Sequence, residues 1–238
     1  MPEIDALGES SSLQKGGLNH QAIEDYAKTI YMLAQEESPV STSRIAEARQ
    51  VKPGSATGMI KRLANLGLVD YQKHYGVTLT EDGTRIALEV IRHHRLIELY
   101  LIEALGFSWD EVHEQADILE HVISEKLEER IARALGYPEF DPHGAPIPTK
   151  ELVMPDVSNQ PLSTLTAGEE AIVSRIIWPD EDGEMLRYVG SLGLMPGATF
   201  TVLDVAPFDG PITVQIGEEQ KVVGHTVATA VLVEKTNG

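Results

Sequence analysis

Histidines and carboxylates recur at helical spacing in one short stretch of the sequence, at His113, Asp117, Glu120 and His121. At about 100° per residue, all four fall within little more than a quarter of a helix circumference. Imidazole and carboxylate together suit a divalent first-row metal. Such residues more often form a solvated, weakly paired face, but four on one stripe favour a metal site.

A second pair of the same kind comes earlier in the chain. His94 and Glu98 are four residues apart, so they share one face of a helix. The sequence therefore predicts a metal centre carried on two helices. The other elements would convert metal occupancy into a change of activity.

Composition restricts the chemistry further. The 238 residues include no cysteine, which excludes disulfides, thiolate metal sites and cysteine nucleophiles. The first residues do not form a secretory signal, and no apolar run approaches the length of a membrane span. We therefore expect a cytoplasmic protein with no membrane partner.

The charge is distributed unevenly. The net charge is −18, which by itself argues against nucleic acid as a partner. Between Ser38 and Gly76, however, six basic residues face only Glu47 and Asp70; they are Arg44, Arg49, Lys52, Lys61, Arg62 and Lys73. One basic segment of an acidic chain is thus the candidate for DNA contact.

The same segment has the element order of a winged helix-turn-helix. The predicted helices cover residues 20–37 and 44–49 and a stretch from Pro53 to before Gly67, and a two-stranded ribbon covers 69–73 and 77–80. The third helix would enter the major groove of double-stranded DNA, and basic residues would contact phosphates. The predicted DNA-binding residues are Ser43, Lys52, Pro53, Ser55, Thr57, Gly58, Lys61, Arg62 and Lys73. A winged helix used for protein contacts is the alternative.

Two long helices should follow. The first runs from Glu81 to Leu105, and its segment 96–102 is apolar nearly all round, which indicates a subunit interface. A capping box at Ser108–Glu111 begins the second helix, which carries the metal stripe and ends at Gly136. A homodimer built on these helices would present two DNA-binding heads to a palindromic operator.

The remaining residues predict a stiff linker and a small β domain. Expected strands cover 170–177, 199–205, 211–216 and 227–233, with a short helix near 185–192. The predicted fold is mainly α with a small β domain, comprising a winged helix-turn-helix, a helical dimerisation and metal-binding domain, and an SH3-like β-barrel. The predicted limits are a mobile tail at 1–18, the DNA-binding domain at 19–88, the helical domain at 89–140, the Pro-rich linker at 141–162 and the SH3-like domain at 163–238.

Taken together, residues 19–238 resemble the diphtheria-toxin-repressor family of metal-dependent transcriptional regulators, and within it the manganese-responsive branch. The resemblance is carried by Ile23–Tyr31, Val51–Val69, Arg92–Leu96, Val112–Val122 and Asp141–Pro148. It implies a repressor of metal-uptake genes with up to two ions per subunit. It also implies a primary site of Asp25, Asp117, Glu120 and His121 and an ancillary site of His94, Glu98 and His113, completed by Glu181 or Glu184.

The resemblance also bears on the metal. Iron-responsive relatives carry a methionine and a cysteine where this chain has Asp25 and Asp117, and carboxylates in those places suit Mn²⁺. Some manganese regulators carry a second acidic ligand where this chain has Lys28, which puts a paired-metal arrangement in doubt. Fe²⁺ remains the alternative ion, since intrinsic affinities run against manganese.

The expected mechanism is a hinge gated by charge. Without metal, Asp25, Asp117 and Glu120 repel one another, and a divalent cation would tie the DNA-binding head to the dimer core. One rival is a winged-helix regulator that answers an organic ligand. Another is a metallohydrolase, but the sequence lacks a His-Glu-x-x-His motif, so we expect no enzyme activity.

Overall fold

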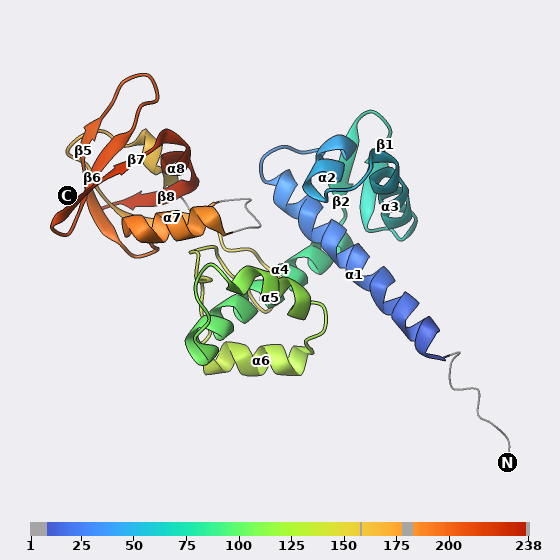
Figure 1. The fold of residues 1–238 in the computed structure, drawn as a ribbon. Coiled ribbons are helices and arrows are strands. Elements are labelled where there is room, and N and C mark those ends of the chain that lie inside the picture. The colour runs from blue at the N-terminus through green and yellow to red at the C-terminus, as the bar shows by residue number, and fades with distance from the viewer. Residues whose placement is uncertain (1–8, 158, 178–182, 237–238) are drawn as a thin grey trace, which may run out of the picture. The chain divides into compact units, whose positions relative to one another are not determined.

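The computed structural model describes residues 9–157, 159–177 and 183–236. The chain divides into two compact units (Figure 1). The first contains the residues up to Arg92 together with Lys150–Val153, and the second contains His93–Thr149 and the residues from Met154 onward. Among the described residues, no helix combines the length and the apolar character needed to cross a membrane.

The first unit contains the predicted winged helix-turn-helix. Its helices are α1 (Glu9–Ala34), α2 (Thr42–Ala48) and α3 (Pro53–Asn65). The side chain of Ser41 accepts a hydrogen bond from the Arg44 amide and so caps α2. Pro53 occupies the first turn of α3, where its missing N–H costs nothing. Buried side chains from all three helices form one core, including Ile30, Ile45, Ile60 and Leu63.

The wing is the antiparallel pair β1 (Val69–Gln72) and β2 (Gly76–Leu79). Val77 also pairs with Val40, which fastens the wing to the segment before α2. Gly76 has a φ of +135°, and a Cβ there would lie 2.8 Å from the Cβ of Pro39. Only glycine allows this close approach.

The first helix begins earlier than predicted. It starts at Glu9, so residues 9–18, expected to belong to a mobile tail, are helical. Serine and glycine are poor helix formers, but extending a nucleated helix costs far less than starting one. Residues 1–8 of the expected tail lie outside the described residues.

Helix α4 (Glu81–Leu105) matches the prediction at both ends. The Thr80 hydroxyl accepts a hydrogen bond from the Gly83 amide, and Glu81 and Asp82 suit the positive end of the helix dipole. Gly106, with a φ of +72°, ends the helix.

The predicted metal-stripe helix is wrong as a single helix. The structure has α5 (Val112–Leu119) and α6 (Glu125–Ala134), separated by a corner. Ser124 adopts extended backbone angles, and its side chain accepts a hydrogen bond from the Leu127 amide. It therefore starts a new helix where the periodic pattern alone suggests a continuous one.

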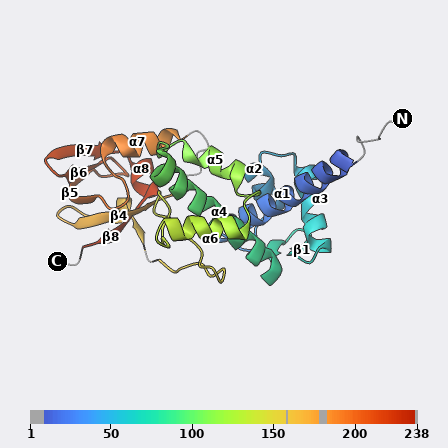
Figure 2. The same ribbon diagram turned by 90° about the horizontal axis from the view of Figure 1, so that it is seen from below.

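The second half of α4, whose apolar sequence indicates a subunit interface, is covered on two sides by helices of its own chain. Ile97 and Leu101 pack on Val112 and Ala116 of α5. Leu96 packs on the α6 residues Ile131 and Ala132 and on Ile147 of the following loop. Figure 2 shows α6 alongside α4.

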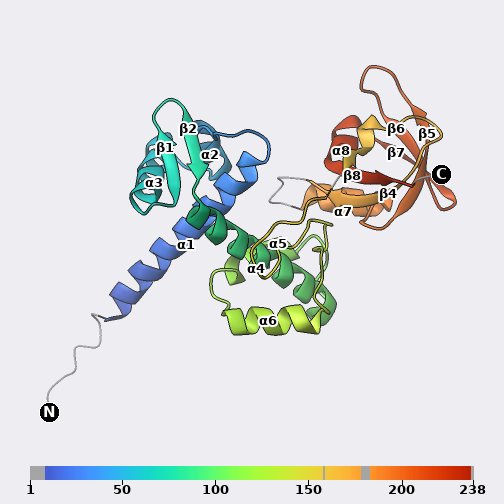
Figure 3. The same cartoon turned by 180° about the vertical axis from the view of Figure 1, so that it is seen from behind.

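The β domain is an antiparallel sheet with the strand order β3-β8-β4-β5-β6-β7. Figure 3 shows it with its helices α7 and α8. Leu162 and Leu194 are among the fully buried side chains of its core. The elements are β3 (Gln160–Pro161), a 3-10 turn (Leu162–Thr164), β4 (Glu170–Ile176), α7 (Glu184–Leu192), β5 (Thr199–Val205), β6 (Ile212–Ile216), β7 (Glu219–Val223), α8 (His225–Ala230) and β8 (Val231–Lys235).

Three expectations for this domain need correction. Strands β3 and β7 were not predicted, and the expected strand 227–233 is α8 followed by β8. The strand pairs of the described residues leave β3 and β7 as the two edges, so they do not close a barrel. A two-residue edge strand such as β3 offers too few hydrogen bonds for closure. The fold is SH3-like nonetheless.

Candidate metal centre

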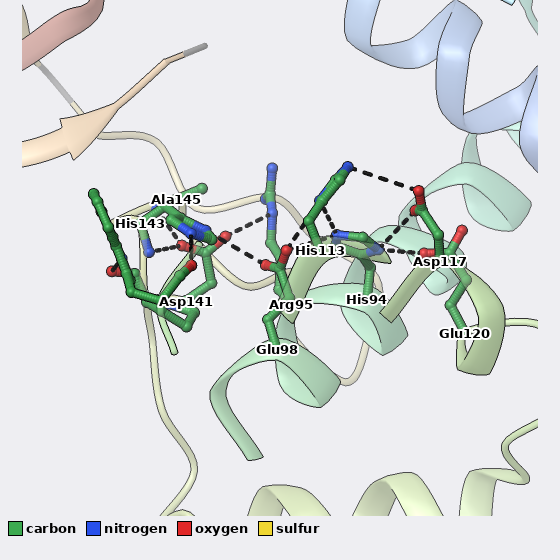
Figure 4. A network of polar contacts seen from close by, with 11 residues as sticks. His94, Arg95, Glu98, His113, Asp117, Glu120, Asp141, His143 and Ala145 are labelled. Atoms are coloured by element: carbon green, nitrogen blue, oxygen red, sulfur yellow. Dashed lines mark hydrogen bonds and ion pairs between the residues drawn. The ribbon is translucent and has the colours of Figure 1, made fainter. Parts of the chain in front are cut away.

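Helix α4 supplies the two innermost residues of the site, His94 and Glu98. Their i,i+4 spacing puts both on the face that packs against α5, and both are buried. His94 Nε2 lies 2.9 Å from Glu98 Oε1. The other ring nitrogen of His94 points away from Glu98 (Figure 4), toward the C-terminal end of α5.

His94 connects the two predicted metal sites. Its Nδ1 lies 2.5 Å from Glu120 Oε2 and 3.3 Å from Asp117 Oδ1. The family resemblance implies that Asp117 and Glu120 belong to the primary site and His94 to the ancillary one. Within the second unit, one imidazole contacts members of both sets.

His113 of α5 completes a first group of ligand atoms. Its Nδ1 lies 3.0 Å from His94 Nε2 and 3.1 Å from Glu98 Oε1, and its Nε2 lies 3.7 Å from Asp117 Oδ2. His94, His113 and Asp117 offer ligand atoms that all lie within 4.8 Å of one another. His113 and Asp117 are partly exposed. Nitrogen and oxygen donors with an open side fit a first-row divalent ion.

A second group, missed in the sequence, is formed by Glu98, Asp141 and His143. His143 Nδ1 lies 3.7 Å from Glu98 Oε2. Asp141 Oδ1 accepts hydrogen bonds from the amides of His143 and Ala145 at 2.8 and 2.9 Å, which holds the loop in a tight turn. In the predicted domain limits, Asp141 and His143 belong to the Pro-rich linker. The sequence signal that could have indicated this group is the Asp141-Pro-His143 tripeptide, in which one proline separates an acid from a histidine.

Charge and burial shift the pKa values of this second group in different directions. Burial by itself would raise the pKa of Glu98, but His94, His113 and His143 outweigh it and hold that pKa well below its usual range. Burial raises the pKa of Asp141, and the charge of Glu98 raises it further. Burial opposes a charged His143, but the contact with Glu98 gives a net increase in its pKa. The cluster therefore holds Glu98 as the anion around which the histidines gather.

Arg95 fixes the loop that brings Asp141 into the site. Its Nε lies 3.6 Å from Asp141 Oδ2, and its Nη1 donates to the carbonyl of Pro146. Without the positive charge of Arg95, less of the repulsion between the buried carboxylates of Asp141 and Glu98 would be offset. The loop is thus part of the site and not only a connection between domains.

Glu120 and His121 lie at the corner between α5 and α6. Glu120 is the C-terminal cap of α5 and is buried. His121 Nε2 lies 3.4 Å from Glu120 Oε1, and His93 Nδ1 lies 3.1 Å from the Glu120 carbonyl oxygen. The corner, not a continuous helical stripe, sets the direction of these two ligands.

Three predicted ligands remain to be placed: Asp25, Glu181 and Glu184. Asp25 belongs to the first unit, where its Oδ2 accepts a hydrogen bond from Arg49 Nη2 at 2.9 Å. Glu184 is exposed at the start of α7 and belongs to none of the groups of metal-competent side chains found among the described residues. Glu181 lies outside the described residues.

Most of the predicted DNA-binding residues are exposed on the first unit. Thr57 and Arg62 are half-buried, and the Thr57 hydroxyl donates to the carbonyl of Pro53. The others are exposed: Ser43, Lys52, Pro53, Ser55, Gly58, Lys61 and Lys73. The exposed basic side chains on α3 and the wing suit phosphate contacts.

Three family models match the chain, one for each part. "Iron dependent repressor, N-terminal DNA binding domain" matches residues 20–77, and "Iron dependent repressor, metal binding and dimerisation domain" matches residues 80–149. The FeoA domain matches residues 160–235. These matches define a class of protein: a DNA-binding repressor that responds to a metal.

Individual relatives agree along nearly the whole chain. The iron-dependent repressor IdeR of Mycobacterium tuberculosis is 34% identical over 224 residues, which are 89% of this chain and 96% of IdeR. A structure of a manganese-dependent transcriptional repressor in complex with manganese is 38% identical, with a TM-score of 0.81, and the match covers 90% of this chain and 100% of that one. The manganese regulator SloR is 32% identical, with a TM-score of 0.73, over 90% of this chain and 98% of that one. The chain therefore belongs to the diphtheria-toxin-repressor family of metal-dependent transcriptional regulators.

Proposed function

We propose that this regulator responds to Mn²⁺. The observation that carries the proposal is the donor set: the clustered side chains offer imidazole nitrogen and carboxylate oxygen, and the chain has no cysteine. Such donors suit a hard divalent ion. The likeness to two manganese-responsive proteins points the same way.

The proposed sites divide the ligands between two ions per subunit. Asp25 would join Asp117, Glu120 and His121 at the primary site, which would link the DNA-binding unit to the dimerisation domain. Glu98 would organise the ancillary site. The side chains available around it are His94, His113, Asp141 and His143.

The function of the bound cation is to neutralise carboxylates that otherwise repel one another. Asp117 and Glu120 lie on one element of the second unit, and Asp25 lies on α1 of the first. Binding one ion with all three restricts the position of the DNA-binding head. Shifting a head from mostly free to mostly fixed needs a differential affinity of roughly 5 kcal/mol.

The proposed DNA-binding form is a homodimer on a palindromic operator, acting as a repressor of metal-uptake genes. Exposed apolar side chains on and between α5 and α6 support a second copy as the partner. Ile118, Val122 and Leu127 expose 66%, 73% and 47% of their surface. Two heads on a two-fold axis would match two half-sites.

The test is a titration of operator binding by fluorescence anisotropy. A palindromic duplex would first be selected from a random pool with the manganese-loaded protein. We expect binding with Mn²⁺ and little binding with chelator, and Asp25→Ala should abolish the response. Glu47→Ala, an exposed acid of the same unit, is the matched control. Full binding by the chelated wild-type protein would refute metal control.

Fe²⁺ is the second candidate effector. It is favoured by the iron-dependent family models and by the identity to IdeR. The same titration, performed without oxygen, separates the two ions by the free concentration that gives half-maximal operator binding.

A further inference from the structure

The carboxylate of Asp25 is bound by a cation within its own unit. Arg49 Nη2 lies 2.9 Å from Asp25 Oδ2, although the two residues are 24 positions apart in the chain. Asp25 is on α1, and Arg49 is the C-terminal cap of α2. The pair therefore joins a predicted metal ligand to the helix-turn-helix itself.

Arg49 has few other attachments. Its guanidinium carbon lies 5.8 Å from the centre of the Tyr26 ring, and its Nε is buried without a hydrogen-bond partner among the described residues. Asp25 is the acid with which it pairs. One nitrogen contacts one oxygen, not the two parallel bonds of the strongest arginine–carboxylate pairs.

We propose that Arg49 competes with the metal for Asp25 and thereby sets the metal concentration at which the regulator responds. This rests on the proposed function, in which Asp25 is a ligand. A guanidinium and a divalent cation both bind the same carboxylate, and they repel each other. The ion must either displace Arg49 or bind beside a positive charge, and both weaken its affinity.

The geometry allows the exchange. The Arg49 side chain is 33% exposed and that of Asp25 is 19% exposed, so the guanidinium can turn into water without moving the backbone. A single, partly exposed pair of this kind is worth little by itself. Arg49 is thus a weak competitor that a divalent ion with several ligands overcomes.

Arg49 also changes the metal-free protein. It compensates one of the three carboxylates whose repulsion is expected to keep the DNA-binding unit free of the dimerisation domain. Removing it should leave Asp25 more available to an ion. Removing Arg49 should therefore raise the metal affinity. Removing an arginine that orients a ligand would instead lower it.

The experiment measures Mn²⁺ affinity calorimetrically on the full-length protein without DNA. We expect Arg49→Leu to lower the Kd about three- to tenfold, while Arg49→Lys keeps the charge and stays near wild type. Arg44→Leu is the matched control, because Arg44 is equally exposed on the same helix but pairs with Glu36 and Glu37. Circular dichroism and thermal unfolding check that each variant is folded.

The outcomes separate the two proposals. The role of Arg49 is overturned if Arg49→Leu leaves the Mn²⁺ Kd unchanged or raises it. It is also overturned if Arg44→Leu lowers the Kd by the same factor. Asp25→Ala should weaken Mn²⁺ binding. In the double variant, adding Arg49→Leu should then leave the Kd of Asp25→Ala unchanged, which supports competition at that carboxylate. If Asp25→Ala leaves the Kd unchanged, the primary site itself is wrong; if it weakens binding but Arg49→Leu does not tighten it, only the competition fails.

Discussion

At the scale of single residues, His94 is the most constrained side chain of the centre. Both of its ring nitrogens face carboxylate oxygens, Glu98 on one side and Glu120 on the other. That arrangement is satisfied when both nitrogens carry protons. A metal bound at either nitrogen replaces a proton, so occupancy at one predicted site changes the partner that His94 offers to the other.

His94→Ala should therefore weaken both sites. We expect the Mn²⁺ affinity to fall at least about tenfold, in line with the loss of groups that hold or orient ligands, and the number of bound ions to drop. Calorimetric titration and metal analysis after dialysis measure this. His225→Ala, in the β domain, is the control and should bind like wild type; equal losses in both would contradict the assignment.

Asp110 gives a pH prediction away from the ligands. The hydrogen bond from Arg187, 2.9 Å away, lowers the pKa of Asp110. A carboxyl group whose pKa is lower in the folded protein stabilises the fold at pH values above its pKa in the unfolded chain. That stabilisation is lost as the pH falls through the pKa of the folded state. Wild type should therefore lose more thermal stability than Asp110→Asn below about pH 4. The difference should be small because the pair is partly exposed. If the melting temperatures of the two proteins fall equally with pH, the ion pair contributes nothing to stability.

At the scale of elements, the corner between α5 and α6 depends on Ser124. Its side chain accepts from the Leu127 amide 3.3 Å away. Ser124→Ala should cost about 0.5–2 kcal/mol of unfolding free energy, measured by urea denaturation. Because the same corner directs Glu120 and His121, Mn²⁺ affinity should fall as well. Ser41→Ala removes an equivalent cap on α2 and should lower stability without a comparable effect on the second unit's ligands.

Gly144 is the element-scale test of the ligand loop. Its φ is +82°, and a Cβ there would lie 1.9 Å from the carbonyl oxygen of Ser174 on β4. Gly144→Ala must move the loop, and we expect it to destabilise the protein and to weaken metal binding. Gly168 also has a positive φ, +90°, but an added Cβ meets nothing within 4 Å. Gly168→Ala should show only the backbone strain, about 1 kcal/mol, in thermal unfolding, and similar losses in both variants would argue against the contact.

Elements with a clear periodicity were predictable from the sequence. The limits of α4 follow from Thr80 and Gly106, and the wing follows from its apolar alternation. The break before Ser124 was missed because a serine cap inside an amphipathic run is a local hydrogen-bond choice that periodicity does not register. The group around Glu98 was missed because Asp141 and His143 reach it only through the folding of a distant loop. Asp25 was found by resemblance, since nothing in its spacing on α1 marks a ligand.

At the scale of the whole molecule, the acidic chain with one basic face predicts a particular salt dependence. The net charge is −18, so binding should depend on the few cations of α3 and the wing. Lys61→Ala should reduce the slope of log K against log salt by about 1, with unchanged Mn²⁺ affinity. Anisotropy titrations from low to moderate salt measure the slope. Lys221→Ala, which removes a cation of the β domain paired with Glu219, should leave it unchanged.

The ligand loop is also attached to the β domain by its backbone. The amide of Ile176 donates to the carbonyl of His143 at 2.9 Å, one residue before the close approach of Gly144 to Ser174. The second metal group is therefore shaped jointly by residues of two domains that belong to separate family models. Substitutions in β4 should therefore change metal selectivity even when every ligand stays the same. The two domains are expected to evolve together and not as exchangeable modules.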